Sequence, residues 1–120
     1  MYTALVVDDE QELRQAIIES VDWEKAGFRV VGDAGNGIDA LELAEKLEPD
    51  LILTDIKMPM MTGLELAKQV RELRPATQVV ILSGYDDFGY ANRRPALCET
   101  VKLMDWVFDS FSIQAALDTD

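Results

Sequence analysis

The chain has 120 residues, 48% of them hydrophobic, which is enough for one folded domain with a single core. Its net charge of −12 argues against direct contact with nucleic acid or an anionic membrane, because both need a basic surface. The charge suits a cation or a basic partner, although such acidity also keeps a small domain soluble. A single cysteine and no histidine exclude an internal disulfide, a Ser-His catalytic pair and most zinc sites.

The first ten residues have no basic region or long apolar run, so we expect no signal peptide. No stretch approaches the roughly 20 apolar residues of a membrane span. The lone cysteine, Cys98, fits a reducing compartment. These features together predict a cytoplasmic protein without a membrane segment.

Short apolar runs alternate with helical patterns in the first half of the chain. Residues 4–7 are a continuous apolar run, as expected for a strand buried on both faces, and Asp8 and Asp9 follow it. From residue 11 the spacing changes to that of an amphipathic helix, with inward positions at Leu13, Ala16, Ile17, Ser20 and Val21. Gly27 interrupts this pattern, and residues 28–32 predict a second strand.

The alternation continues through the middle of the chain. Residues 38–47 have helical spacing and end at Glu48-Pro49-Asp50. Residues 51–54 predict a third strand, which ends at Asp55. A helix over residues 63–73 and a strand over residues 79–82 follow, and that strand ends at Ser83.

Strands that alternate with helices predict a parallel sheet covered by helices on both faces. Right-handed crossovers then determine how the chain winds. With a fifth strand near the C-terminus, the expected fold is a doubly wound, five-stranded α/β/α domain that spans residues 1–120.

The C-terminal part, residues 92–120, is less regular. Residues 85–88 predict the start of a helix, but Pro95 falls where its interior would be. The apolar residues 106–108 predict the fifth strand, and Ser112 a cap for a short last helix. Three aromatic residues in this part are expected to lie in the core: Trp106, Phe108 and Phe111. If they are exposed instead, they would favour a contact between two copies of the chain.

Acidic side chains follow two of the predicted strands. In an open parallel sheet, ligands bind outside the carboxyl ends of the strands, so Asp8, Asp9 and Asp55 should converge there. Carboxylates that close repel one another, and a divalent cation removes the repulsion. Oxygen ligands with retained water suit Mg²⁺. The alternative is that these aspartates cap helices or lie in solvent.

A carboxylate beside Mg²⁺ has the chemistry of a nucleophile toward phosphorus, giving an aspartyl phosphate. The metal screens the repulsion between the two anions. The hydroxyl of Ser83, after the fourth strand, would be able to hydrogen-bond the phosphoryl oxygens; otherwise Ser83 only ends the strand.

Three motifs in this order resemble the response-regulator receiver domains of two-component signalling, whose CheY-like fold is the flavodoxin-like α/β/α sandwich. They are VVDDE at residues 6–10, PDLILTDIKMPMMTG at residues 49–63 and VILSGY at residues 80–85. The resemblance covers roughly residues 1–91. Residues 21–24 and 83–88 further resemble receivers fused to AraC-type DNA-binding domains.

The resemblance implies a role for each matching residue. Asp55 would be the phosphoacceptor and Ser83 the residue that senses the phosphoryl group. Asp9, Asp55 and the backbone carbonyl of Lys57 would ligate Mg²⁺, and Asp8 would contribute through water. The implied partners are a sensor histidine kinase and a fused AraC-type output domain, for which a chain of this length has no room.

One family feature is missing. Receivers have a lysine followed by proline after the fifth strand, and here Lys102 is the only lysine after Lys68, with no proline behind it. An alignment without gaps places Asp105 at this position, and an insertion near residues 93–95 places Asp109 there, with Ser110 in place of the proline. An added carboxylate would leave the protein poorly phosphorylated or poorly switched.

Three functions therefore remain open. The first is a phosphoacceptor receiver that signals by a change of shape. The second is a degenerate receiver that binds partners without phosphorylation, which the missing lysine favours. The third is a Mg²⁺-dependent phosphatase with an aspartate nucleophile, but such enzymes usually have an acid/base aspartate two residues later, where this chain has Lys57.

Overall fold

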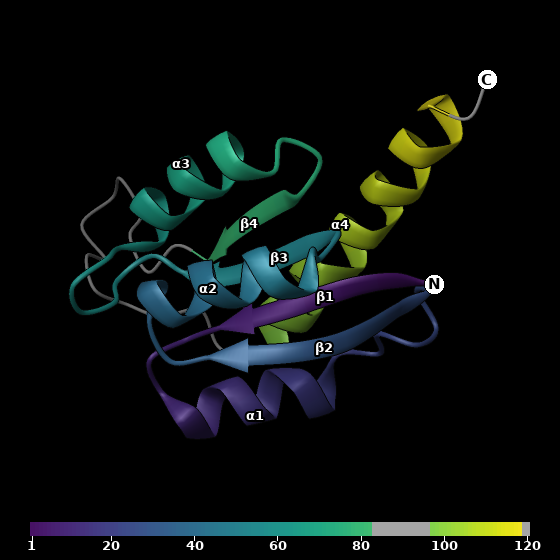
Figure 1. Ribbon diagram of the computed structural model, residues 1–120. Coiled ribbons are helices and arrows are strands. Elements are labelled where there is room, and N and C mark those ends of the chain that lie inside the picture. Colours follow the sequence, from purple (N-terminus) through teal and green to yellow (C-terminus); the bar gives the residue numbers. More distant parts are fainter. Residues whose placement is uncertain (83–96, 119–120) are drawn as a thin grey trace, which may run out of the picture.

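The protein is described by a computed structural model over residues 1–82 and 97–118. Strands and helices alternate up to the fourth strand, and one long helix follows (Figure 1). The elements are β1 (Tyr2–Val7), α1 (Gln11–Ser20), β2 (Phe28–Ala34), α2 (Gly37–Leu47), β3 (Leu51–Asp55), α3 (Gly63–Leu73), β4 (Gln78–Leu82) and α4 (Leu97–Asp118). None of the helices within these described residues is long and apolar enough to cross a membrane.

The described strands form one parallel sheet in the order β2-β1-β3-β4. β1 is central and pairs with both β2 and β3, and all strands direct their carboxyl ends to the same edge (Figure 1). This confirms the predicted doubly wound parallel sheet, although the described sheet has four strands and not five. The seven elements from β1 to β4 lie close to where the apolar runs and helical spacing predict them.

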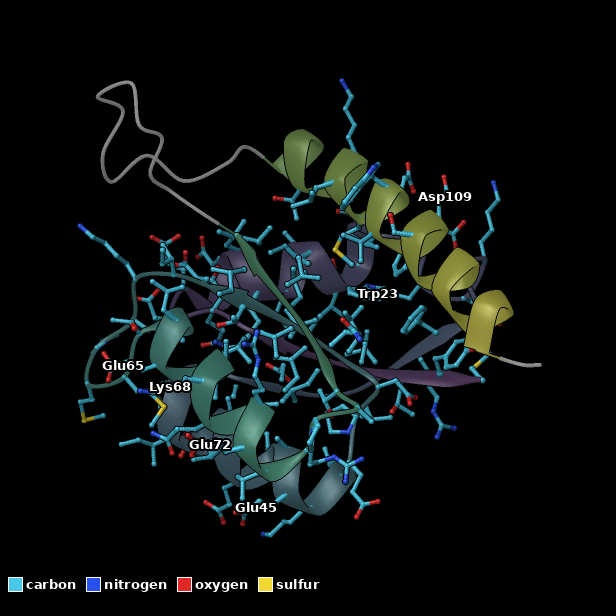
Figure 2. The ribbon with its side chains drawn as sticks, turned by 90° about the horizontal axis from the view of Figure 1, so that it is seen from above. Trp23, Glu45, Glu65, Lys68, Glu72 and Asp109 are labelled. Atoms are coloured by element: carbon cyan, nitrogen blue, oxygen red, sulfur yellow. The ribbon has the colours of Figure 1, made fainter. Side chains whose placement is uncertain are left out.

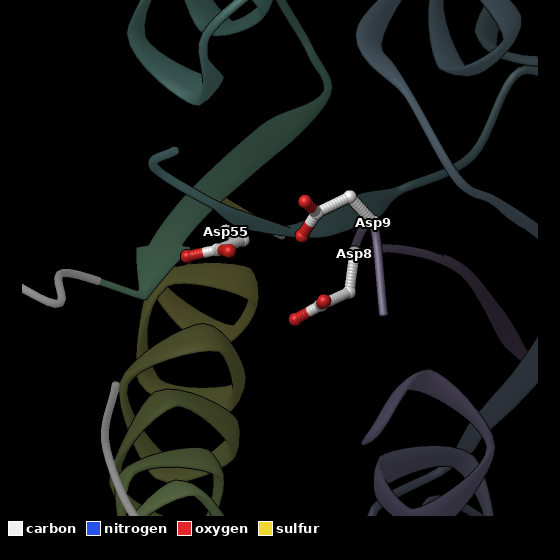
Figure 3. A group of neighbouring side chains, drawn as sticks. All are labelled: Asp8, Asp9 and Asp55. Carbon is white, nitrogen blue, oxygen red and sulfur yellow. The ribbon is translucent and has the colours of Figure 1, made fainter. Parts of the chain in front are cut away.

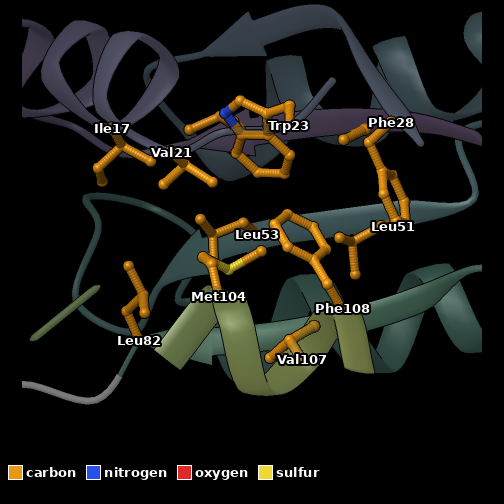
Figure 4. Close-up of a cluster of buried hydrophobic side chains, with 12 residues drawn as sticks. Ile17, Val21, Trp23, Phe28, Leu51, Leu53, Leu82, Met104, Val107 and Phe108 are labelled. Atoms are coloured by element: carbon orange, nitrogen blue, oxygen red, sulfur yellow. The ribbon is translucent and has the colours of Figure 1, made fainter. Parts of the chain in front are cut away.

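Helices cover both faces of the sheet. α2 and α3 pack on one face, over a hydrophobic cluster. Its centre is formed by Leu5, Ile52 and Leu66, each of which is 0% exposed. α1 and α4 pack together on the other face. There the aromatic rings of Trp23, Phe28 and Phe108 meet in the second cluster (Figure 4).

The predicted fifth strand over residues 106–108 is wrong, because these residues lie inside α4. Trp106 is 67% exposed, whereas Phe108 belongs to the core, as expected. Buried α4 side chains recur with helical spacing, at Thr100, Met104, Val107 and Phe108. Other apolar residues between them make the sequence look like a continuous run and hide this period. Ser112 likewise lies within α4 and does not cap a new helix, while the helix predicted from residue 85 falls outside the described residues.

Thr62 caps α3 at the edge where the strands end. Its Oγ1 accepts a hydrogen bond from the backbone N–H of Glu65 at 3.2 Å. We expect Thr62→Ala to lower the free energy of unfolding by about 1 kcal/mol, the usual effect of losing such a cap. Thr62→Ser keeps the acceptor and should change stability by only a few tenths of that value. Urea denaturation of both variants checks this, and equal losses would mean that the hydroxyl does not act as a cap.

Candidate functional site

The register of the sheet brings the predicted aspartates together. Val7 of β1 pairs with Thr54 of β3, so the next residues, Asp8 and Asp55, leave adjacent strands at the same edge. Asp9 follows Asp8 before α1 begins. Two segments far apart in the sequence therefore place three carboxylates at one point.

Figure 3 shows these three side chains at the carboxyl edge of β1 and β3. One carboxylate oxygen from each of Asp8, Asp9 and Asp55 lies within 4.8 Å of the other two. Asp8 and Asp55 are almost fully buried, at 2% and 3% exposure, while Asp9 is exposed. The cluster therefore has a sheltered base and an open side.

The geometry of this cluster fits Mg²⁺. The ion binds oxygen at about 2.1 Å, so ligands on opposite sides of it lie about 4.2 Å apart. A cluster within 4.8 Å thus needs only a small closure, or one bridging water, to surround the ion. The ligands are all hard carboxylate oxygens, and the exposed side leaves room for the waters that Mg²⁺ usually retains.

Local hydrogen bonds fix the start of the acidic segment. The Asp8 N–H donates to the carbonyl of Ala34 at 3.1 Å, which continues the ladder to β2. Its Oδ1 accepts from the N–H of Glu10 at 2.9 Å, which turns the chain toward α1. Its carbonyl accepts from Arg14 Nη1 at 2.7 Å. The backbone of Asp8 is therefore held by both β2 and α1.

The loop after β3 is also fixed around Asp55. Asp55 Oδ1 accepts from the N–H of Ile56 at 2.8 Å, and the N–H of Gly63 donates to the Ile56 carbonyl at 2.8 Å. Met58 is buried in the α2–α3 cluster. Met60 has a left-handed backbone with φ of 68°, so the turn is tight. Burial of Met58 accounts for its place in the motif at residues 49–63, and position 63 needs glycine because an added Cβ would overlap the Asp55 carbonyl oxygen.

The other predicted site residues have different positions. Lys57 is exposed in the loop after Asp55, and the role of its carbonyl stays a prediction. Ser83 lies outside the described residues. Asp105 and Asp109 are exposed on α4, and Figure 2 shows Asp109 on its outer side. Neither belongs to the aspartate cluster, so the expectation that one of them adds a carboxylate at the site is wrong.

Arg14 is the residue at this site that the sequence did not identify. It lies on α1 with only 13% of its side chain exposed, and it contacts both Asp8 and Asp33. One signal was present in the sequence, because Arg14 precedes Ile17, Ile18 and Val21 by three, four and seven residues. An arginine on the inward stripe of a helix needs a partner inside the protein.

Comparison with known proteins places the chain in a family. Residues 4–97 match the response regulator receiver domain. The chain is 40% identical over 91 residues to the uncharacterized transcriptional regulatory protein YesN of Bacillus subtilis, covering 76% of this chain and 25% of YesN. It is 34% identical over 90 residues to the transcriptional regulatory protein HptR of Staphylococcus aureus, covering 75% of this chain and 35% of HptR. The chain thus matches about a quarter to a third of the length of these relatives.

Solved structures agree with this assignment. The receiver domain of AraT, a response regulator from Geobacillus stearothermophilus, superposes with a TM-score of 0.80 at 30% identity, covering 95% of this chain and 98% of that one. A two-component transcriptional regulator AraC from Clostridium phytofermentans gives 0.79 at 29% identity, covering 98% and 100%. The chain therefore belongs to the response regulator receiver domain family and is a receiver domain of a two-component response regulator.

Proposed function

We propose that Asp55 accepts a phosphoryl group from a sensor histidine kinase, with Mg²⁺ held by Asp8, Asp9, Asp55 and the backbone carbonyl of Lys57. The observation that carries this proposal is the convergence of three carboxylates within 4.8 Å, two of them almost fully buried. A buried cluster of like charges is costly unless a cation balances it. The family assignment supplies the general chemistry, namely phosphorylation with Mg²⁺.

Phosphotransfer then needs little from the protein beyond positioning. An Asp55 oxygen attacks phosphorus, a new O–P bond forms, and the P–N bond to the kinase histidine breaks, with the electron pair leaving on the imidazole. Bound Mg²⁺ supplies charge compensation for the phosphoryl oxygens. The hydrogen bond from the Ile56 N–H holds Asp55 Oδ1, which fixes how its carboxylate is presented. By the resemblance, Ser83 then binds the phosphoryl group.

The degenerate receiver remains the second candidate, because the sequence has no lysine followed by proline after β4. Asp105 and Asp109 do not join the aspartate cluster, so the missing lysine is the remaining ground for weak switching. We expect phosphorylation without a full change of shape. The phosphatase alternative has less support, since Lys57 stands where the acid/base aspartate would be.

The proposal also includes an output domain that works with this receiver. The similar proteins YesN and HptR are described as transcriptional regulatory proteins much longer than the matched region. We infer that a DNA-binding output domain of AraC type works with this receiver in a cytoplasmic regulator. The receiver itself, with a net charge of −12, is not expected to touch DNA.

We also propose that two copies of the chain pair through their α4 helices. Lys102, Trp106 and Asp109 are exposed at positions that share one face of the helix. Antiparallel pairing of two α4 helices would place Lys102 opposite Asp109 of the second copy and bring both Trp106 rings to the twofold axis. We expect Trp106→Ala to shift the protein from dimer to monomer in sedimentation velocity. A monomeric wild type at high protein concentration would contradict this pairing.

Phosphoryl uptake tests the proposed function. The protein is incubated with acetyl phosphate and followed by intact-mass spectrometry, with Mg²⁺ or with a chelator. We expect one phosphoryl group per chain with Mg²⁺ and none with the chelator. No uptake in either case would favour the degenerate receiver. Sustained turnover of p-nitrophenyl phosphate would favour the phosphatase.

A further inference from the structure

Arg14 lies directly behind the acidic pair and contacts two elements at once. Its Nε donates to Asp33 Oδ2 of β2 at 2.6 Å, and its Nη1 donates to the Asp8 carbonyl at 2.7 Å. The side chains of Arg14 and Asp33 are 13% and 34% exposed, so this ion pair is partly shielded from water. The planar guanidinium makes both bonds in a fixed geometry.

The surrounding backbone leaves a close fit for this side chain. A Cβ added to Gly35 would lie 3.3 Å from Arg14 Nη1, which is tighter than ordinary contact. Arg14 is also anchored at its own backbone, because its N–H donates to the Glu10 carbonyl at 2.9 Å. The guanidinium is therefore held between α1, the end of β2 and the residue after it.

We propose that Arg14 is a positioning residue for the cation site: by bridging Asp33 and the Asp8 carbonyl, it holds the Asp8–Asp9 segment where its carboxylates can share Mg²⁺ with Asp55. The inference rests on the proposed Mg²⁺ site and extends it to a residue that touches no carboxylate of the cluster. Removing groups that orient metal ligands typically weakens metal binding tenfold or more.

Two other roles for Arg14 predict different results. If only its positive charge mattered, removing it would make the site more negative, and Mg²⁺ would bind more tightly. If only its contribution to folding mattered, stability would fall and the Mg²⁺ affinity of the folded protein would not change. Positioning alone predicts weaker binding by protein that is still folded.

The experiment is a titration of Mg²⁺ into the metal-free protein by isothermal titration calorimetry at constant ionic strength. We expect Arg14→Met to weaken Mg²⁺ binding about tenfold. Arg14→Lys keeps the charge but cannot make both bonds, so it should also weaken binding, by a smaller factor. Gly35→Ala, which crowds Nη1, should act in the same direction.

Arg74→Met is the matched control. Arg74 donates from Nε to Thr77 Oγ1 at 3.3 Å and pairs with Glu48 at 3.5 Å, but it lies between α3 and β4, at the opposite edge of the sheet. This variant loses a hydrogen bond and an ion pair, as Arg14→Met does. Its Mg²⁺ affinity should stay within twofold of the wild type.

Amide hydrogen exchange of the metal-free protein gives a readout that does not depend on the ion. The amides of Asp8 and Glu10 should exchange faster in Arg14→Met than in the wild type, and Arg74→Met should leave them unchanged. If the wild type binds Mg²⁺ and Arg14→Met binds it equally well or more tightly, the inference about Arg14 is overturned, but the proposed function stands. No Mg²⁺ binding by the wild type would overturn both.

Discussion

Gly63→Ala is expected to lower the free energy of unfolding by about 3 kcal/mol, the upper end of the range for overpacking. A Cβ at this position would overlap the backbone carbonyl oxygen of Asp55 and come within 3.1 Å of the Ile56 Cα. Backbone atoms cannot turn aside as a side chain can. Because alanine favours a helix over glycine by about 1 kcal/mol, the measured loss would understate the clash. Urea denaturation measures it.

Gly27→Ala is the control for this variant. Gly27 has a positive φ of 85°, but an added Cβ would meet nothing within 4 Å. Its expected loss is about 1 kcal/mol, from backbone strain alone. If both variants lost the same stability, close approach of α3 to the end of β3 would not be the reason for glycine at position 63.

Asp55→Asn is expected to abolish phosphoryl uptake from acetyl phosphate, because an amide oxygen is not a nucleophile of this kind. The same change should stabilise the metal-free protein by about 1 kcal/mol, since it removes one of three clustered negative charges. Mg²⁺ at 100 times its dissociation constant should raise the free energy of unfolding of the wild type by about 2.7 kcal/mol. If Asp55→Asn makes the site tenfold weaker, the same Mg²⁺ concentration should stabilise the variant by only about 1.4 kcal/mol. Intact-mass spectrometry and thermal unfolding measure these effects.

Asp50→Asn is the matched control at the other end of the same strand. Asp50 accepts hydrogen bonds from the Thr3 N–H and hydroxyl, at 2.8 and 3.3 Å. Its loss should lower stability and leave phosphoryl uptake intact. Uptake by Asp55→Asn equal to that of the wild type would mean that another residue accepts the phosphoryl group.

The strands and the aspartate cluster were predictable for a simple physical reason. Strands buried on both faces must be continuously apolar, so residues 4–7 and 51–54 stand out, and the polar residues that follow them mark the edge of the sheet. Parallel pairing then brings Asp8 beside Asp55. Neither step depends on details of side-chain packing.

α4 and Arg14 were harder to predict, because each depends on which neighbours surround it. Trp106 is apolar but exposed, and it fills a gap in the helical period between Met104 and Val107. Arg14 is charged but mostly buried, and the partner that makes its burial possible is Asp33, nineteen residues away in the sequence. Residue type alone assigns both to the wrong environment. Asp109 was also hard to place. The sequence aligned it with the lysine that follows the fifth strand in receivers, but it lies inside the helix α4.

The proposed role of Asp55 is tested most directly by locating the phosphoryl group on the wild-type protein. After reaction with acetyl phosphate and Mg²⁺, borohydride reduction converts an aspartyl phosphate to a stable product that peptide mass spectrometry can place. We expect modification at Asp55 and at no other residue, and none when the metal is chelated. Modification at a different residue, or at Asp55 regardless of metal, would contradict it.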